Sequence, residues 1–297
     1  MSAGTPARRC GAVVAALLTA VVGCHRAGDA GASSPHDEPA WNGTWNYTQP
    51  DIAADRDVGH LSCPDGFALV LPQLGWARFA QSGRRLVVET DQGCRWTFTR
   101  RGLGAALDPP AQTCFNQVIG SSYTLTRWDI AVAGTDETET IVGNSHQPGG
   151  DCMFTLPAGR RTRVTESDAD DAAAFLGAWS FDATDAPGAN LQQVVCPGDA
   201  PGVLRPGVAT GGVTITQLSS RAIRVVTDDG CPWTLAVAGN TAELDPPQQT
   251  CPASQRTRRF WAMASDGQRI ATVASGAERV GDAPCDVVLA TGRLVPR

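Results

Sequence analysis

The chain contains one sequence segment twice, and this duplication limits the possible folds more than any other feature. Residues 90–97 (TDQGCRWT) match residues 227–234 (TDDGCPWT), and residues 107–114 (LDPPAQTC) match residues 244–251 (LDPPQQTC) in the same register. Internal repeats of this length are the mark of repeated structural units. The sequence therefore predicts two copies of one domain.

The correspondence extends beyond these two segments and defines the modules. Each copy has about the length of a typical domain, so we expect one module at residues 41–164 and another at 175–297. The acidic stretch 165–174 reads as a solvated linker between them. The remaining matches are Gly43-Thr44-Trp45 with Gly177-Ala178-Trp179, Cys63-Pro64 with Cys196-Pro197, Trp128 with Trp261, and Cys152 with Cys285.

Each module contains four cysteines, which predicts disulfides if the chain is exported to an oxidising compartment. Four cysteines allow three connectivities. Cys94 and Cys114 are 20 residues apart, as are Cys231 and Cys251, and this equal spacing favours pairing within a hairpin. The remaining pairs would then be Cys63 with Cys152 and Cys196 with Cys285. Zinc is disfavoured because the sequence has no C-x-x-C pair.

Alternation of apolar and polar residues predicts β-strands. Cys94, Trp96 and Phe98 alternate with polar residues, a period of two that is typical of a half-buried strand. Asp-Gln-Gly and Asp-Asp-Gly follow β-branched runs as turns. Short strands joined by such turns favour an all-β fold: two tandem antiparallel meander barrels, or sandwiches, each with two disulfides.

The first strand of each module resembles that of a known barrel family. Gly43-Thr44-Trp45 and Gly177-Ala178-Trp179 are similar to the G-x-W motif of lipocalins and other calycin barrels. The resemblance implies a small barrel with the tryptophan closing one end. It also implies that a small apolar ligand is a candidate for the barrel mouth.

The N-terminus resembles that of a bacterial lipoprotein. Arg8 and Arg9 precede an apolar run at residues 11–22, a signal-peptide pattern that is too short to span a bilayer. Val21-Val22-Gly23-Cys24 then resembles a lipobox, which implies cleavage after residue 23, lipidation of Cys24 and a membrane partner. His25 in place of Asp implies an outer-membrane lipoprotein that faces the periplasm or the cell surface.

The segment at residues 24–40 predicts a disordered tether, because it is rich in Gly, Ala, Ser, Pro and Asp. The formal net charge of −6 argues against a nucleic-acid partner, which requires a basic surface. Nothing in the sequence indicates a cofactor.

Few residues suggest catalysis. His60 and His146 are the histidines within the modules, neither recurs in the second copy, and no G-x-S-x-G elbow accompanies them. The recurring acids at positions 91, 108, 228 and 245 lie next to Gly or Pro, where they stabilise turns. Trp41 and Trp76 do not recur, which makes them candidates for exposed contacts, whereas the recurring tryptophans predict core positions.

The sequence therefore favours a non-enzymatic, lipid-anchored envelope protein with two β modules that bind a small apolar ligand or an envelope macromolecule. A structural or spacer lipoprotein is the alternative, and a surface hydrolase is a further one. The motifs that recur are turns, tryptophans and cysteines. Function is therefore expected in what differs between the copies, or in their pairing.

Overall fold

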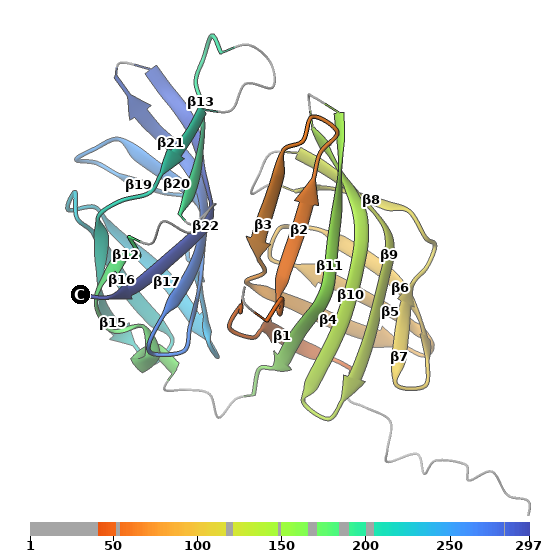
Figure 1. Ribbon diagram of the computed structural model, residues 1–297. Helices are drawn as coiled ribbons and strands as arrows, with labels where there is room; N and C mark the ends of the chain where they lie inside the picture. The colour runs from red at the N-terminus through yellow and green to blue at the C-terminus, as the bar shows by residue number, and fades with distance from the viewer. Residues whose placement is uncertain are drawn as a thin grey trace, which may run out of the picture. The chain divides into compact units, whose positions relative to one another are not determined.

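The first module is a closed antiparallel barrel in the computed structural model (Figure 1). The structure describes residues 41–51, 54–116, 121–147, 150–165, 171–183, 190–199, 205–281 and 283–297. Eight strands form the closed path: β1 (Gly43–Tyr47), β4 (Trp76–Ser82), β5 (Arg85–Thr90), β6 (Arg95–Arg101), β7 (Gly104–Leu107), β9 (Ser121–Ala133), β10 (Asp136–Gln147) and β11 (Gly150–Arg163).

The long last strand β11 closes this barrel. Its C-terminal part pairs with β1, with Arg163 opposite Trp45. Its N-terminal part pairs with β2 (Val58–Ser62), which forms a hairpin with β3 (Ala68–Pro72), drawn in orange in Figure 1. The short strand β8 (Gln112–Asn116) pairs with β9 outside the closed path. One edge of β11 therefore serves both the barrel and the added hairpin.

The second module repeats this topology. Its closed path is β12 (Gly177–Phe181), β15 (Gly212–Ser219), β16 (Ala222–Thr227), β17 (Pro232–Ala238), β18 (Thr241–Leu244), β20 (Arg256–Ser265), β21 (Ile270–Val280) and β22 (Ala283–Pro296). The hairpin of β13 (Leu191–Val195) and β14 (Arg205–Val208) extends from β22, and β19 (Gln249–Cys251) pairs with β20. The predicted all-β fold of two tandem barrels is confirmed.

Residue alternation explains why these strands form. In β6 the side chains of Trp96, Phe98 and Arg100 are buried, while those between them are exposed or half-buried. Gly93, in the turn before β6, has a φ of 80°, a left-handed conformation that glycine adopts at little cost. The sequence analysis did not anticipate β4, in which Ala77 and Phe79 form the buried face.

The recurring tryptophans form the core of each barrel, as predicted. Trp96 and Trp128 meet edge to face with ring centroids 6.1 Å apart, and Trp233 and Trp261 repeat this contact at 6.2 Å. All four side chains are at most 5% exposed. The two modules therefore share one aromatic scaffold.

The prediction that Trp41 makes an exposed contact is wrong. Its side chain is fully buried and stacks on Phe79. The backbone carbonyl of Trp41 accepts a hydrogen bond from Trp45 Nε1 at 3.1 Å, as the carbonyl of Phe175 does from Trp179 Nε1 at 2.8 Å. Trp41 and Phe175 are therefore equivalent aromatic core residues.

Two disulfides clamp each barrel. Cys94–Cys114 and Cys231–Cys251 each close 20 residues, whereas Cys63–Cys152 and Cys196–Cys285 each close 89 residues. The short bridges join the turns that precede β6 and β17 to β8 and β19, which follow the Asp-Pro-Pro turns. The long bridges join the β2 and β13 hairpins to the closing strands.

Both barrels belong to one compact unit. The 3-10 helix η1 (Asp171–Phe175) ends the predicted linker and precedes β12. The signal segment, the lipobox-like motif with Cys24 and the tether lie outside the described residues. Within the described ranges, no helix has the length and apolar character needed to cross a membrane.

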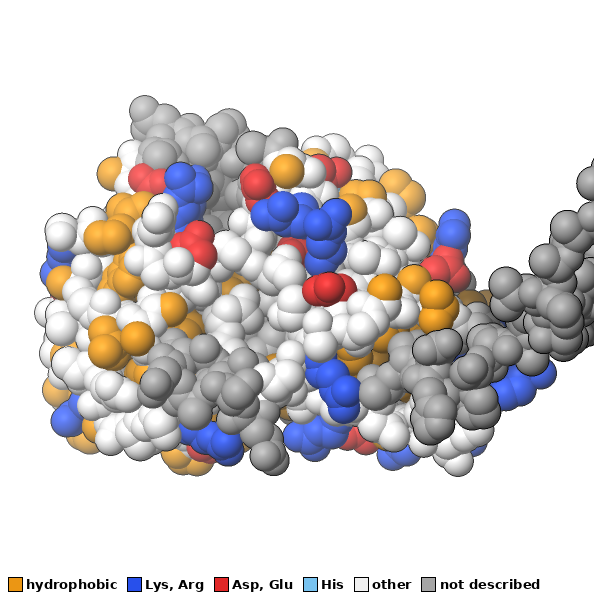
Figure 2. All heavy atoms as spheres, turned by 90° about the horizontal axis from the view of Figure 1, so that it is seen from below, with side chains coloured by type: hydrophobic (Ala, Val, Ile, Leu, Met, Phe, Trp, Pro, Cys, Tyr) orange, Lys and Arg blue, Asp and Glu red, His pale blue; other side chains and the backbone are white. Residues whose placement is uncertain are grey.

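Charged side chains on the molecular face shown in Figure 2 lie mixed, with basic and acidic groups close to one another. Exposed ion pairs of the chain include Arg127 with Asp129 and Arg259 with Asp286. These pairs are exposed, so each contributes little to stability.

Candidate functional site

The interior of the first barrel contains a buried charged cluster, which we call the Arg161 cluster. It consists of Tyr47, Glu137, Glu139 and Arg161, together with the indole of Trp128. Arg161 Nη1 lies 2.5 Å from Glu139 Oε2 and 3.6 Å from Glu137 Oε2. Trp128 Nε1 donates to Glu139 Oε2 at 2.7 Å, and the Tyr47 hydroxyl donates to Glu139 Oε1.

Strand register brings these groups together. Arg161 on β11 lies opposite Tyr47 on β1 and opposite Glu137 on β10. The guanidinium stands 3.9 Å from the centroid of the Tyr47 ring, a cation–π contact. Glu139 follows Glu137 by two residues, so both carboxyl groups point into the barrel.

The Arg161 cluster holds one cation against two carboxyl groups in the buried interior of the barrel. Glu137 is 1% exposed, and neither of its carboxyl oxygens has a hydrogen-bond partner within the part of the chain that the structure describes. Burial, followed by the nearby charge of Glu139, raises the pKa of Glu137 well above its ordinary value. Burial therefore favours the protonated form of Glu137.

Asp57 adds a second titratable group at the same barrel. Its carboxylate accepts hydrogen bonds from the Thr48 hydroxyl and from the backbone N–H of Arg160. Burial raises the pKa of Asp57 to about 6, although both hydrogen bonds oppose the shift. Asn190 takes the equivalent place in the second barrel, where it accepts from the backbone N–H of Arg293 at 2.8 Å.

The second barrel replaces the Arg161 cluster with uncharged residues. Trp261 Nε1 donates to Thr272 Oγ1 at 2.8 Å, where Trp128 donates to Glu139. The register of β12, β21 and β22 gives the other replacements. Phe181 stands for Tyr47, Ile270 for Glu137, Thr272 for Glu139 and Leu294 for Arg161.

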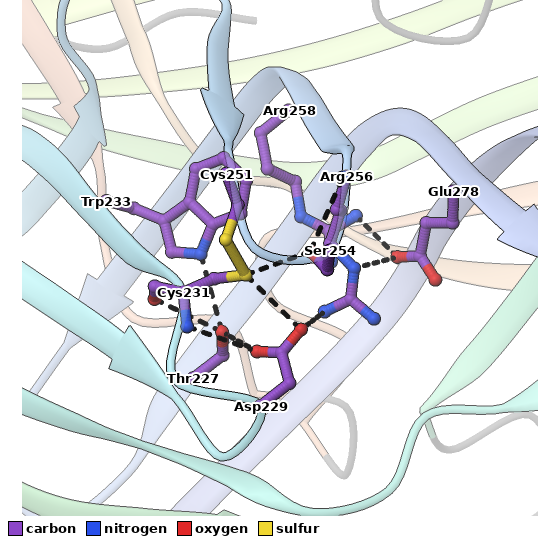
Figure 3. Close-up of polar contacts among 9 residues, drawn as sticks. All are labelled: Thr227, Asp229, Cys231, Trp233, Cys251, Ser254, Arg256, Arg258 and Glu278. Atoms are coloured by element: carbon purple, nitrogen blue, oxygen red, sulfur yellow. Dashed lines mark hydrogen bonds and ion pairs between the residues drawn. A yellow bond between two sulfur atoms is a disulfide. The ribbon is translucent and has the colours of Figure 1, made fainter.

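A different cluster, the Arg258 cluster, lies beside Trp233 in the second barrel (Figure 3). It consists of Asp229, Arg256, Arg258 and Glu278. Glu278 Oε1 lies 3.0 Å from Arg258 Nη1 and 3.2 Å from Arg256 Nε, and Arg256 Nη1 lies 3.1 Å from Asp229 Oδ2. Two cations therefore face two carboxylates in one chain of contacts.

The surroundings of the Arg258 cluster hold it in place. The Arg258 guanidinium lies 5.9 Å from the Trp233 centroid and 5.8 Å from that of Trp261. Burial lowers the pKa of Arg258, and Glu278 opposes this shift. The four side chains are 13–33% exposed, whereas Arg161 and Glu137 are at most 2% exposed. Solvent therefore reaches this cluster and not the first.

The first barrel has uncharged residues where the second has the Arg258 cluster. The hydroxyl of Tyr123 donates to Gln92 Oε1 at 3.3 Å, in the place of the contact between Arg256 and Asp229. Each barrel therefore carries a charged cluster that the other lacks. Sequence analysis missed both clusters. The signal was the charged alternation in residues 136–140 (DETET) and in residues 256–259 (RTRR).

The two candidate histidines are not brought together. His60 on β2 contacts Asp55 at 2.6 Å, and it lies opposite Thr155 on β11, four positions from Asp151. His146 on β10 contacts Asp151 through Nδ1 and Thr124 through Nε2, each at 2.8 Å. Both imidazoles are about two-fifths exposed.

The recurring aspartates differ in environment. Burial raises the pKa of Asp91 to about 7, and Asp91 also interacts with Glu243 of the second module. Asp228 instead pairs with Arg297, whose hydrogen bond lowers the pKa of Asp228. The prediction of a turn role therefore describes only part of what Asp91 does. Trp76, a predicted exposed contact, is half-buried and donates through Nε1 to Glu243 Oε2 at 2.6 Å.

Within the described ranges, His, Cys, Asp and Glu side chains form no group of three that could hold a metal ion. Within each cluster, the charged groups mainly contact other members of the same cluster. These contacts hold the barrel interior in one arrangement. The Arg258 cluster also has hydrogen-bond donors that solvent can reach.

No protein-family model and no curated protein sequence matches this chain. Two solved structures align with it at low similarity. One is a "putative outer membrane protein" of Bacteroides fragilis NCTC 9343, with 8% identity, a TM-score of 0.27, and coverage of 86% of this chain and 98% of that chain. The other is a protein of unknown function from the DUF3598 family of Nostoc punctiforme PCC 73102, with 12% identity, a TM-score of 0.22, and coverage of 86% and 96%. At these TM-scores neither alignment carries an argument about function.

Proposed function

We propose that this chain is a lipid-anchored, non-enzymatic protein of the bacterial cell envelope, whose two barrels act as binding modules. Arg8, Arg9 and the lipobox-like residues that end at Cys24 support export and lipidation. The disulfides of both barrels support an oxidising compartment.

One observation carries the proposal: two disulfide-clamped copies of one barrel carry different polar groups on the same aromatic scaffold. The Trp96–Trp128 contact and the Trp233–Trp261 contact have nearly the same geometry. The Arg161 cluster and the Arg258 cluster, by contrast, have no counterparts. A scaffold that stays the same while its polar groups change suits binding modules, in which local chemistry decides specificity.

The filled interior favours a binding surface outside the barrel lumen. Trp96, Phe98 and Trp128 pack against each other in the first barrel with centroid separations of 5.1–6.1 Å. An apolar ligand of the kind that lipocalin-like barrels enclose would have to displace these rings. The barrel surfaces and the contact between the modules are therefore better placed to bind, which favours a polar ligand or an envelope macromolecule.

Metabolic labelling tests the anchor. Cells that express the full-length chain are grown with an alkyne-bearing fatty acid, and the Cys24→Ser variant is the matched control. We expect label and membrane fractionation for the parent chain and neither for the variant. An unlabelled parent chain that is cleaved at another position would refute the lipid anchor.

Titration with a fluorescent fatty acid tests where binding occurs. The full-length protein in detergent is expected to leave the fluorescence of the probe unchanged, because the lumen is filled by side chains. Saturable binding that is lost when a larger side chain at Phe98 blocks the lumen would return the site to the barrel mouth.

A surface hydrolase is the second candidate, and one observation favours it. Thr124, His146 and Asp151 lie in a line with contacts of 2.8 Å, which is the order of hydroxyl, base and acid in a hydrolase. The Thr124 hydroxyl also bonds that of Thr113 at 2.7 Å. Ester hydrolysis by the parent chain that His146→Ala removes and His60→Ala retains would establish this candidate over the binding role.

A further inference from the structure

A pocket of about 360 Å³ lies where the end of β11 meets the turn between β17 and β18. It is separate from the Arg161 and Arg258 clusters. Its lining includes Asn46, Thr135, Thr162, Arg163, Gly239 and Asn240. The pocket therefore combines hydroxyl, amide and guanidinium groups from the first module with a turn of the second.

The first module sets four of these groups in one place. Asn46 on β1 lies opposite Thr162 on β11. The backbone N–H of Arg163 donates to the carbonyl of Thr135 at 2.9 Å, which ties the β9–β10 turn to the end of β11. A Cβ atom at Gly43 would lie 3.1 Å from Arg163 Nε. The glycine of the G-x-W motif therefore leaves room for this guanidinium.

The second module closes the pocket with two residues. Asn240 Nδ2 donates to the backbone carbonyl of Tyr47 at 3.0 Å, and Asn46 Nδ2 donates to the carbonyl of Ala238. Gly239 has a φ of +59°, and a Cβ atom there would lie 3.1 Å from Asn46 Nδ2. These contacts bring the β17–β18 turn against β1 with little space to spare.

The side-chain oxygen of Asn46 is a buried acceptor to which none of the described residues donates a hydrogen bond. Asn46 is 1% exposed, and its Oδ1 has no hydrogen-bond partner among the described residues, while its Nδ2 is bonded to Ala238. A buried acceptor without a partner destabilises the folded state. A ligand with an O–H or N–H donor would remove that destabilisation.

Arg163 and two threonines supply hydrogen-bond donors to the pocket, whereas Asn46 Oδ1 supplies an acceptor. Arg163 Nη2 donates to the carbonyl of Asn42 at 2.6 Å, and within the described ranges no carboxylate lies in ion-pair distance of its guanidinium. The Thr135 and Thr162 side chains are exposed. A guanidinium whose hydrogen-bond partner is a neutral carbonyl keeps a positive charge that a ligand carboxylate can pair with.

We propose that this pocket binds a hydroxylated carboxylate of the size of a sugar acid. The carboxylate lies on Arg163, a ligand hydroxyl donates to Asn46 Oδ1, and the threonine hydroxyls bond the remaining oxygens. The volume is at the small end of the range for ligand pockets, about 300–1,000 Å³. This inference rests on the proposed binding role but not on the lipid anchor.

Calorimetric titration of the full-length protein in detergent tests the ligand class. The probes are glucuronate, glucose, which keeps most of the hydroxyls and lacks the carboxylate, and acetate, which has the carboxylate alone. We expect glucuronate to bind at least tenfold more tightly than either control. Equal affinities for glucuronate and acetate, or no heat with any probe, would overturn the proposal.

Two variants place the binding in the pocket. Arg163→Gln is expected to weaken glucuronate binding at least tenfold, and Arg160→Gln, an exposed arginine of the same strand, to leave it unchanged. Circular dichroism checks that both variants fold. If Arg163→Gln misfolds, Thr162→Val gives the same test with an expected loss of at least threefold. Unchanged affinity in the folded pocket variants would overturn the assignment.

An oligoglucuronide distinguishes the two sources of this ligand chemistry. Tighter binding of the oligomer than of the monosaccharide, per chain, indicates an envelope polysaccharide that carries sugar acids. Equal or tighter binding of the monosaccharide indicates a free sugar acid. Fatty-acid labelling at Cys24 is independent of both results, so failure of the pocket and failure of the anchor remain distinguishable.

Discussion

Asp57 and Asn190 show how one side-chain atom changes the chemistry of a shared position. Both residues have a left-handed backbone, with φ values of 55° and 54°, which Asp and Asn tolerate better than most residues. Both accept a hydrogen bond from a backbone N–H of the closing strand, that of Arg160 for Asp57 and that of Arg293 for Asn190. Each donor lies three residues before the end of its strand. Only Asp57 can gain or lose a proton.

Asp57 makes stability depend on pH. Its pKa is about 6 in the folded chain and about 3.9 in an unfolded one. The folded chain therefore holds the proton more tightly, and the free energy of unfolding falls as the pH rises from about 4 through about 6. Below pH 4 the group is neutral in both states and contributes no penalty.

Asp57→Asn, the residue of the second copy, is expected to remove this dependence. The variant should exceed the parent chain by about 1–3 kcal/mol in free energy of unfolding at pH 8, and match it near pH 3.5. Urea unfolding followed by tryptophan fluorescence measures both values. Asp136→Asn, at an exposed position, is the control. A gain that is equal at both pH values would contradict the assignment to Asp57.

At the scale of strands, the two barrels show that the same path tolerates a charged or an apolar lining. Arg161→Leu alone leaves the carboxyl groups of Glu137 and Glu139 buried without their cation. Breaking a buried ion pair in this way costs about 3–5 kcal/mol, whereas replacing the whole set with well-packed apolar groups is often neutral or stabilising.

Exchanging the whole lining is therefore expected to rescue the single variant. The quadruple variant Tyr47→Phe, Glu137→Ile, Glu139→Thr and Arg161→Leu carries the residues of the second barrel. We expect Arg161→Leu to lose about 3–5 kcal/mol and the quadruple variant to regain most of it. Urea unfolding of both chains decides. A quadruple variant that is as unstable as the single one would show that the barrels differ in more than these four residues.

The strands that were predicted correctly are those in which buried apolar residues alternate with exposed polar ones along the sequence. Trp96 and Phe98 alternate with polar residues, so β6 was visible without knowledge of its neighbours. Trp41 was misjudged because its counterpart is Phe175, a different aromatic that an identity match does not find. The Arg161 cluster could not be predicted, because Glu137 meets Arg161 only through the register of β10 with β11.

At the scale of the whole molecule, a pair of carboxyl groups joins the modules. Burial raises the pKa of Asp91 to about 7 and raises that of Glu243, and each group interacts with the other. Trp76 Nε1 donates to Glu243 at 2.6 Å. The raised pKa values of both acids favour a proton between them, and ionisation of Asp91 as the pH rises through about 7 places a negative charge at this contact.

The contact between the modules is therefore expected to weaken at alkaline pH. The folded pKa values are raised, so stability is full below about pH 4 and is lost as the pH rises through about 7. Scanning calorimetry should show one coupled transition at pH 5.5 and two separated ones at pH 8.5. Glu243→Gln should keep the transitions coupled at pH 8.5, and Glu89→Gln should not. Separated transitions at both pH values would exclude this role.

The shared edge of β11 also determines the order in which the first barrel can be completed. β1 and β2 both require β11 as a partner, so neither the closed barrel nor the Cys63–Cys152 bridge can form before the segment 150–163 is available to fold. Cys94 and Cys114 are already available by then, because β6 and β8 precede β9. In a chain that is translocated from its N-terminus, oxidation therefore proceeds from the hairpin bridge to the closure bridge. An oxidant that acts too early would trap Cys63 with the first cysteine that follows it.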